Sequence, residues 1–195
     1  MTPFRYFQLI ALAGLALTLS TVVQAAPLSL AQLMASLAKS PQGAATFTET
    51  KTISILEQPI VSSGELLFIA PDRLEKRTLK PRAETVVLDG DTLTVERGLR
   101  KHVLPLKNYP EVAGMIESIR ATLAGDRKAL EKIYHVALNG DHERWTLELT
   151  PLDAKVGKVI ARIRIEGTKD VVRSVNILQA DGDSSQMTIE KLLLP

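Results

Sequence analysis

Residues 86–95 read Val-Val-Leu-Asp-Gly-Asp-Thr-Leu-Thr-Val, and this stretch decides the fold. Two short runs rich in β-branched residues flank Asp89-Gly90-Asp91, and Gly90 can adopt the positive φ that a tight hairpin turn needs. Strands joined by so short a loop must pair as antiparallel neighbours. The stretch therefore predicts a β-hairpin, and the sequence on both sides of it continues the same pattern.

Short runs of Thr, Val, Ile, Leu and Phe, separated by Gly, Pro, Asn and Asp, extend in both directions. They predict a first set of strands at 45–55, 61–69, 73–80, 84–89, 92–96 and 99–104. A second set is predicted at 134–139, 144–150, 158–166, 171–180 and 185–193. Alternation is clearest in the second set, where Trp145, Leu147, Ile163 and Ile165 lie on an apolar face opposite charged residues. We expect a single antiparallel sheet with one apolar face.

One helical segment precedes these strands and a second interrupts them, which makes the expected fold class α+β. Residues 29–39 carry apolar side chains at helical spacing after Ser29, a good N-cap. In a central insertion at 109–132, Pro110 suits a first helical position and Gly125 a helix end. These helices are too few to cover the apolar face of such a sheet, so the sheet must curl around it. The sequence leaves open whether the enclosed space is a packed core or a cavity.

The insertion helix has one apolar stripe, formed by Val112, Met115, Ile116 and Ile119. Two interpretations are open for this stripe. It could make ordinary core contacts, or it could act as a lid that closes a cavity and yields to an acyl chain. Methionine suits both, because its unbranched thioether side chain repacks easily.

The first residues predict export from the cytoplasm. Arg5 precedes an uncharged run at 9–19, and the small residues Val23 and Ala25 suit cleavage after Ala25. The apolar run is shorter than the roughly 20 residues that span a bilayer. We therefore expect a signal peptide at 1–25, one domain at 26–195 and a periplasmic location.

The composition argues against several classes of site. The chain has no cysteine, which excludes disulfides, thiolate metal ligands and a Cys nucleophile. Its formal net charge of +2 gives no basis for nucleic-acid binding. The three histidines, His102, His135 and His142, lack metal-site spacing, and no nucleophile elbow or P-loop occurs. We expect no enzyme, no metal and no cofactor.

A hydrolase is the enzymatic alternative, and it would need Glu148 and Glu166 as general acid and base. Both carboxylates fall on the charged phase of their strands, facing away from the apolar side. Solvated surface carboxylates are therefore the favoured interpretation.

Three motifs resemble the LolA-type outer-membrane lipoprotein carriers. They are Phe47-Thr48-Glu49-Thr50, then Ser-Gly-Glu-Leu-Leu-Phe-Ile-Ala-Pro-Asp-Arg-Leu at 63–74, then Val-Leu-Asp-Gly-Asp-Thr-Leu-Thr-Val at 87–95. Their order and spacing match over residues 45–105, and the layout of helix and strands extends the likeness across the chain. The resemblance implies an incomplete, half β-barrel of about 10 to 11 strands, closed by helices, with an apolar concavity for acyl chains.

The resemblance also implies which side chains frame the cavity, with the 109–123 helix as part of the lid. With the apolar stripe and faces above, the expected ligand-binding residues are Phe47, Leu66, Phe68, Leu74, Leu88, Leu93, Val95, Val112, Met115, Ile116, Ile119, Trp145, Leu147, Ile163 and Ile165. A register error of one residue would turn a strand's set to the opposite face. The chain departs from the family at Ala70, where lipoprotein-releasing members commonly have an arginine that latches the lid.

We expect a monomeric periplasmic carrier that holds the acyl chains of lipoproteins, or a related lipid, in this cavity. As the resemblance implies, it would take cargo from an inner-membrane donor and pass it to an outer-membrane acceptor. The alternative is a periplasmic module that senses lipid and binds a partner without transferring the lipid. A protein complex that responds to lipid would favour this second role.

Overall fold

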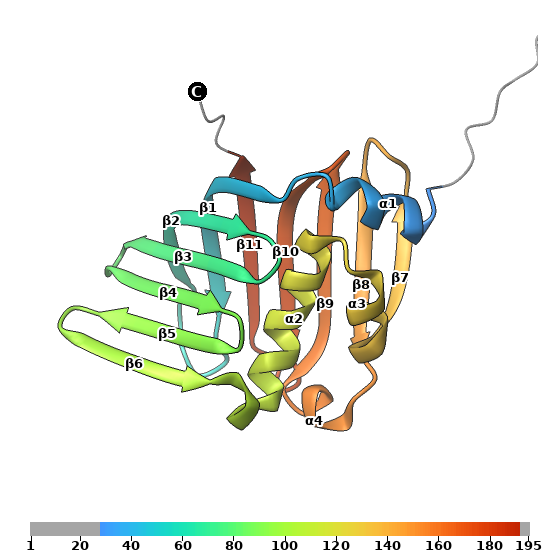
Figure 1. The fold of residues 1–195 in the computed structure, drawn as a ribbon. Coiled ribbons are helices and arrows are strands. Elements are labelled where there is room, and N and C mark those ends of the chain that lie inside the picture. The colour runs from blue at the N-terminus through green and yellow to red at the C-terminus, as the bar shows by residue number, and fades with distance from the viewer. Residues whose placement is uncertain (1–27, 192–195) are drawn as a thin grey trace, which may run out of the picture.

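The computed structural model describes residues 28–191, so the expected signal peptide lies outside the described residues. These residues form one antiparallel sheet with helices on one of its faces (Figure 1). The strands are β1 Gln42–Thr52, β2 Ile60–Ile69, β3 Arg73–Lys80, β4 Glu84–Asp89, β5 Thr92–Arg97, β6 Arg100–Pro105, β7 Tyr134–Gly140, β8 Trp145–Pro151, β9 Ile160–Thr168, β10 Val171–Gln179 and β11 Ser184–Lys191. The helices are α1 Leu30–Leu37, the 3-10 turn η1 Leu106–Asn108, α2 Pro110–Ala124, α3 Arg127–Ile133 and α4 Ala154–Gly157.

The strand order is β6-β5-β4-β3-β2-β1-β11-β10-β9-β8-β7. Consecutive strands pair within β1–β6 and within β7–β11, and the pairing of β1 with β11 joins these two sets. That junction is fixed over eight residue pairs, with Phe47 opposite Ile189 and Glu49 opposite Met187. The sheet does not close, because β6 and β7 are its two edges. The predicted α+β fold with one open, curved antiparallel sheet is confirmed.

The predicted elements match the observed ones except at a few ends. β1 begins at Gln42 rather than residue 45, because its first residues pair with the end of β2 although Gly43 and Ala44 carry little strand preference. It ends at Thr52 rather than residue 55. The four-residue α4 and the three-residue η1 were not predicted, since elements this short show no periodicity.

Local sequence explains where the longer helices begin and end. Ser29 and Gln32 form a capping box at the start of α1, in which Oγ of Ser29 accepts a hydrogen bond from the backbone N–H of Gln32. Pro110 is the first residue of α2, and Gly125 ends that helix in the left-handed conformation with φ of 68°. Asp126 caps α3 by accepting a 3.0 Å hydrogen bond from the backbone N–H of Ala129.

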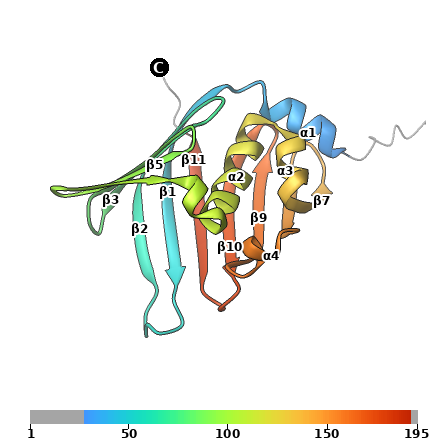
Figure 2. The ribbon, with the colours of Figure 1, turned by 60° about the horizontal axis from the view of Figure 1, so that its bottom comes forward.

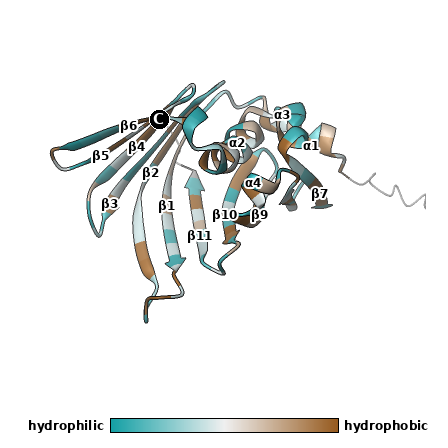
Figure 3. Cartoon of the chain, turned by 90° about the horizontal axis from the view of Figure 1, so that it is seen from below, coloured by the Kyte–Doolittle hydropathy of each residue, from teal (hydrophilic) through white to brown (hydrophobic). Residues whose placement is uncertain are grey.

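The sheet has two unlike halves. The four α-helices gather over β7–β10, whereas β2–β6 extend away as a second arm that carries no helix of its own (Figures 1 and 2). The view from below shows both arms and the bend between them (Figure 3). We call β7–β10 with α1, α3 and α4 the filled half, and β1–β6 the open half. The helix α2 and the strand β11 lie between the two.

The filled half holds the main hydrophobic core. Strand residues Leu147, Leu149 and Ile163 are fully buried there, beneath Leu33 of α1 and Leu130 of α3. Close-packed interiors of this kind contribute most of a domain's favourable free energy. The helices therefore serve mainly to fill this side of the sheet.

One strand pair in the filled half shows how tightly its core is packed. Trp145 on β8 is fully buried opposite Gly167 on β9, and its indole N–H donates a 2.8 Å hydrogen bond to the carbonyl of Lys169. A Cβ at position 167 would lie 2.1 Å from the indole ring, so only glycine fits beside it. The tryptophan is thus a structural part of the core.

Candidate functional site

An apolar cavity of about 380 Å³ lies where the open half faces α2, and it is open to solvent on one side. Nearly all of its exposed wall is apolar. The wall consists of Gln42, Gly43, Ala44, Ala45, Glu49, Leu66, Leu67, Phe68, Leu74, Glu75, Lys76, Val86, Leu88, Leu93, Val112, Met115, Ile116, Ile119, Leu123, Asp170, Val171, Val172, Val175, Ile177, Ser185, Met187 and Ile189. A volume in this range suits a small ligand, and an apolar wall selects an apolar one.

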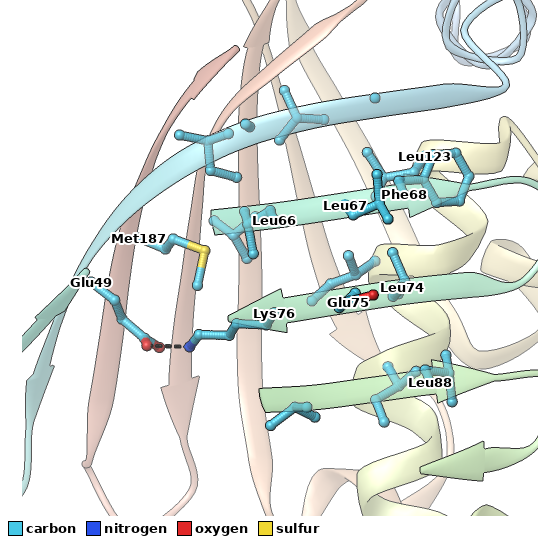
Figure 4. Close-up of a pocket in the computed structure, with 18 of the residues that line it drawn as sticks. Glu49, Leu66, Leu67, Phe68, Leu74, Glu75, Lys76, Leu88, Leu123 and Met187 are labelled. Atoms are coloured by element: carbon cyan, nitrogen blue, oxygen red, sulfur yellow. Dashed lines mark hydrogen bonds and ion pairs between the residues drawn. The ribbon is translucent and has the colours of Figure 1, made fainter. Parts of the chain in front are cut away.

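The structure places nine of the predicted ligand-binding residues in this wall. They are Leu66, Phe68, Leu74, Leu88, Leu93, Val112, Met115, Ile116 and Ile119. Register brings the strand members together, because Phe68 pairs with Leu74, which pairs with Leu88, which pairs with Leu93 across four consecutive strands. Figure 4 shows several of these side chains on adjacent strands. Their binding role stays a prediction.

The other six predicted residues lie outside the wall. Trp145, Leu147, Ile163 and Ile165 belong to the filled half, where α1 and α3 cover them completely. The sequence predicted correctly that these four side chains face the inner side of the sheet. They do not line the cavity, because side chains of the helices pack against them.

Phe47 and Val95 lie at the border of the cavity. Phe47 is buried on β1, with the ammonium group of Lys76 4.8 Å from the centre of its ring. Val95 is half-buried on β5, opposite the wall residue Val86. Phe47 thus contacts the wall residue Lys76, and Val95 is the cross-strand partner of the wall residue Val86.

The helix α2 separates the core from the cavity with two different faces. Its larger apolar side chains, including Met115 and Ile119, line the cavity, while Gly114, Ser118 and Ala121 are buried on another side. A Cβ at Gly114 would lie 2.7 Å from a methyl group of Val156 in α4, so glycine is what allows this close approach. The four residues of the predicted stripe all line the cavity, with Met115 also packed against the core, and the action of the helix as a lid stays a prediction.

The C-terminal end of α2 is held against α1. A Cβ at Gly125 would lie 2.3 Å from the carbonyl oxygen of Met34. Ala70, the position where the resemblance led us to expect an arginine latch, has no side chain that could reach α2, and its backbone N–H donates a 2.7 Å hydrogen bond to the carbonyl of Pro41. The helix also contacts the open half, because Nη1 of Arg120 donates a 3.3 Å hydrogen bond to the carbonyl of Gly90 in the turn between β4 and β5.

One buried ion pair interrupts the apolar wall. Glu49 on β1 accepts a 2.5 Å hydrogen bond from Nζ of Lys76 on β3 (Figure 4). Its other oxygen accepts a 2.6 Å hydrogen bond from Oγ of Ser185, and Oγ of Ser62 lies 3.4 Å from the oxygen bound by Lys76. Nζ of Lys51 lies 3.7 Å from the same Glu49 oxygen that Ser185 contacts. Since Glu49 is only 5% exposed, these partners are what make its burial tolerable.

The protonation of Glu49 reflects the same surroundings. Burial raises the pKa of this carboxyl, but the hydrogen bonds from Lys76 and Ser185, together with the charges of Lys76 and Lys51, outweigh burial. The net result is a pKa held below its ordinary value. Glu49 is therefore ionised at neutral pH, and the pair is a true ion pair.

Sequence reasoning missed these two residues for different reasons. Glu49 belongs to one of the motifs that resemble the family, but its charged side chain was not expected in an apolar cavity wall. Lys76 lies in the strand Arg-Leu-Glu-Lys-Arg-Thr-Leu-Lys, where charges occur on both faces and alternation gives no direction. Met187 and Ile189 on β11 were missed too, because they reach the cavity through the long-range pairing of β1 with β11.

Other candidate chemistry finds no support among residues 28–191. No group of three or more His, Cys, Asp or Glu side chains there could hold a metal ion. Glu166 pairs with Arg164 at 2.8 Å and accepts a 2.8 Å hydrogen bond from Ser174, and Glu148 lies opposite Arg164 in the sheet. No helix in the described part of the chain is both long and apolar enough to cross a membrane.

A family model described as "outer membrane lipoprotein carrier protein LolA-like" matches residues 23–191. The chain belongs to this LolA-like family. The match spans nearly the whole sequence, including all eleven strands and the cavity wall. No curated protein sequence matches this LolA-like chain significantly.

Solved structures resemble this LolA-like protein at low identity. A LolA superfamily protein from Nitrosomonas europaea is 13% identical, with a TM-score of 0.45, and the match covers 86% of this chain and 96% of that one. MucB, in its complex with MucA from Pseudomonas aeruginosa, is 15% identical with a TM-score of 0.46 over 85% of this chain and 58% of that one. LprF from Mycobacterium bovis is 11% identical, with a TM-score of 0.36, over 85% and 95%. None of the three indicates what this chain binds.

Proposed function

We propose that this LolA-like protein is a periplasmic carrier that holds an acyl chain of a lipoprotein, or of a related lipid, in the cavity between its open half and α2. The observation that carries the proposal is a nearly apolar wall that the helices leave partly uncovered. Family membership supports a carrier or binding role rather than catalysis. The predicted signal peptide supports the periplasmic location.

The energetics suit such cargo. Burying an acyl chain contributes about 0.8 kcal/mol per CH₂ group, or roughly 25 cal/mol per Å² of apolar surface. Affinity can therefore be high without directional contacts, and release requires an acceptor whose binding site is better matched. Tight binding followed by release to a better-matched acceptor is what a carrier between an inner-membrane donor and an outer-membrane acceptor needs.

The route of the cargo follows from how α2 is held. It is held to the filled half by close contacts with α4 at Gly114 and with α1 at Gly125, and to the open half by the hydrogen bond from Arg120 to the carbonyl of Gly90. We infer that the chain enters from the uncovered side of the sheet, with α2 as a wall. Entry by this route does not require α2 to move, whereas the lid expected from the resemblance would have to yield to the chain.

The test is to fill the cavity. Leu66→Trp places an indole against Leu74 and Met187, which lie in the same wall, and it should abolish binding of a fluorescent fatty-acid probe while the protein stays folded by circular dichroism. The matched control is Val103→Trp on β6, a half-exposed position outside the wall, which should bind like wild type.

Three outcomes would count against the proposal. Unchanged probe binding by Leu66→Trp would show that the cavity is not the binding site. Native mass spectrometry of protein from the periplasm offers the second check, and consistently empty protein under gentle conditions would count against a carrier. A stable protein complex that responds to lipid, without lipid transfer, would replace carriage by sensing.

A further inference from the structure

The two ends of the cavity wall differ in chemistry, because one carries a charged group and the other is apolar. Lys76 is the one cation among the described wall residues, and it lies opposite Leu66 of β2, two residues along β3 from Leu74. Leu74 lies in a cross-strand row with Leu88 and Leu93, which we call the leucine row, and Phe68 and Leu123 lie beside it, away from Lys76 (Figure 4). A ligand that extends from Lys76 to the leucine row would have one end at a cation and the other among apolar side chains.

Lys76 is held in place but is not saturated. Its ammonium group lies over the ring of Phe47 at 4.8 Å and donates to Glu49, so its position is fixed from two sides. An ammonium group has three N–H donors, and Glu49 is its only hydrogen-bond acceptor within residues 28–191. The side chain keeps 27% of its surface exposed, whereas Glu49 keeps 6%. The remaining donors are therefore available to a ligand.

The surrounding charges favour an anionic partner at this point. Glu49 lies between the ammonium groups of Lys76 and Lys51, which leaves one positive charge in excess. The other wall carboxylates do not cancel that excess locally. Glu75 forms ion pairs with Arg73 and Arg77.

The remaining wall carboxylate, Asp170, belongs to another part of the cavity. It immediately precedes β10, and it accepts a 3.3 Å hydrogen bond from Oγ of Ser40, just before β1 begins. Glu49 lies well along β1 from that point. An anionic head group would therefore be repelled near Asp170 and attracted near Lys76.

We infer that Lys76 receives the anionic oxygen at the head of a single-chain amphiphile, with the acyl chain extending from there to the leucine row and α2. This inference rests on the proposed function, since it assigns the orientation and head-group chemistry of the cargo. A fatty-acid carboxylate and a lipid phosphate share this chemistry. The cavity volume of about 380 Å³, near the lower end of the usual range for ligand sites, suits one chain.

The experiment compares three probes that have the same alkyl chain and different heads: palmitate, palmityl phosphate and palmityl alcohol. Isothermal titration of the full protein measures each affinity for wild type and for Lys76→Met, which keeps the apolar stem and removes the charge. We expect Lys76→Met to weaken binding of at least one anionic probe by about tenfold or more, and to leave the alcohol nearly unchanged. Whether palmitate or the phosphate loses more identifies the natural head group.

Controls keep the result interpretable. Lys76→Met leaves the buried Glu49 carboxylate without its main partner, so the Glu49→Gln/Lys76→Met double variant, which removes both charges, should give the same loss of anion preference with a folded protein. Lys101→Met, which removes an exposed lysine paired with Glu96 on the edge of the open half, should bind all three probes like wild type.

The possible failures are distinguishable. If the wild-type protein binds all three probes and both Lys76 variants keep the wild-type preference for anions, Lys76 does not receive the head group and the carrier proposal survives. Equal weakening of the alcohol and the anions would likewise overturn the head-group role. If none of the probes binds to wild type, the carrier proposal falls and this inference falls with it.

Discussion

The filled half and the open half of this sheet have similar apolar inner faces, but helices cover only the first of them. In β8 and β9, Leu147 and Ile163 are fully buried under helices, whereas Leu66 and Leu74 in β2 and β3 remain half-buried beside a cavity. Strand sequence alone does not distinguish them. The difference comes from where the helices lie, because α1, α3 and α4 all pack over β7–β9 (Figure 1).

The packed core and most of the cavity wall thus lie in different parts of one sheet, and β10 contributes Val172 and Val175 to both. The filled half supplies the packed core, so the open half can leave apolar surface uncovered without unfolding the domain. The helix α2 joins them, with small residues toward the core and larger ones toward the cavity.

The largest expected effect contrasts one leucine from each half. Leu147→Ala should lower the free energy of unfolding by about 3 kcal/mol, because it leaves a void in a closed core. Leu74→Ala should cost less than about 1 kcal/mol, because its side chain already borders open space. Urea denaturation followed by tryptophan fluorescence measures both, and equal losses would contradict the division into halves.

The next effect concerns the anchoring of α2. Gly114→Ala adds a methyl group that would lie 2.7 Å from Val156, and overpacking of this kind should cost about 2 kcal/mol. Val156→Ala, which removes the obstructing methyl groups, should make Gly114→Ala nearly neutral in the double variant. Thermal denaturation of the four proteins in this cycle measures the coupling. Additive effects would mean that α2 is not held at this contact.

The smallest expected effect lies in the open half and depends on pH. Because the pKa of Glu49 is lower in the folded protein, its ionised form stabilises the fold at neutral pH, and that stabilisation is lost as pH falls through the folded pKa. Glu49→Gln should therefore be less stable than wild type by about 1 kcal/mol at neutral pH. The difference should shrink in acid, where wild type also loses the charge. Urea denaturation of both proteins between neutral and acidic pH measures this difference in unfolding free energy. A difference that stays constant with pH would contradict the role given to the Glu49 charge.

Much of the fold could be predicted because its signals are local. Hairpin turns such as Asp89-Gly90-Asp91, and the helix ends at Ser29 and Gly125, are fixed by a few neighbouring residues. The pairing of β1 with β11 and the short α4 depend on long-range packing, and no local pattern announces them.

The site was predictable to a smaller extent for the same reason. Alternation identified inward faces, including those of Leu74 and Leu88, but could not say which inward residues would be covered by helices. Trp145 and Ile163 were assigned to the cavity and are core residues, since α1 and α3 fill the space before them. The ion pair of Glu49 and Lys76 joins strands that are not sequence neighbours, which a one-dimensional pattern does not reveal.

The most direct test of the account is to locate a bound acyl chain within the two halves. A fatty acid that carries a nitroxide near its methyl end can be added to isotope-labelled protein, and paramagnetic broadening of backbone amide signals then reports which residues lie near the chain. The account predicts strong broadening along β2–β5 and α2, and little along β7 and β8. Broadening centred on β7 and β8, or none anywhere at saturating probe, would contradict it.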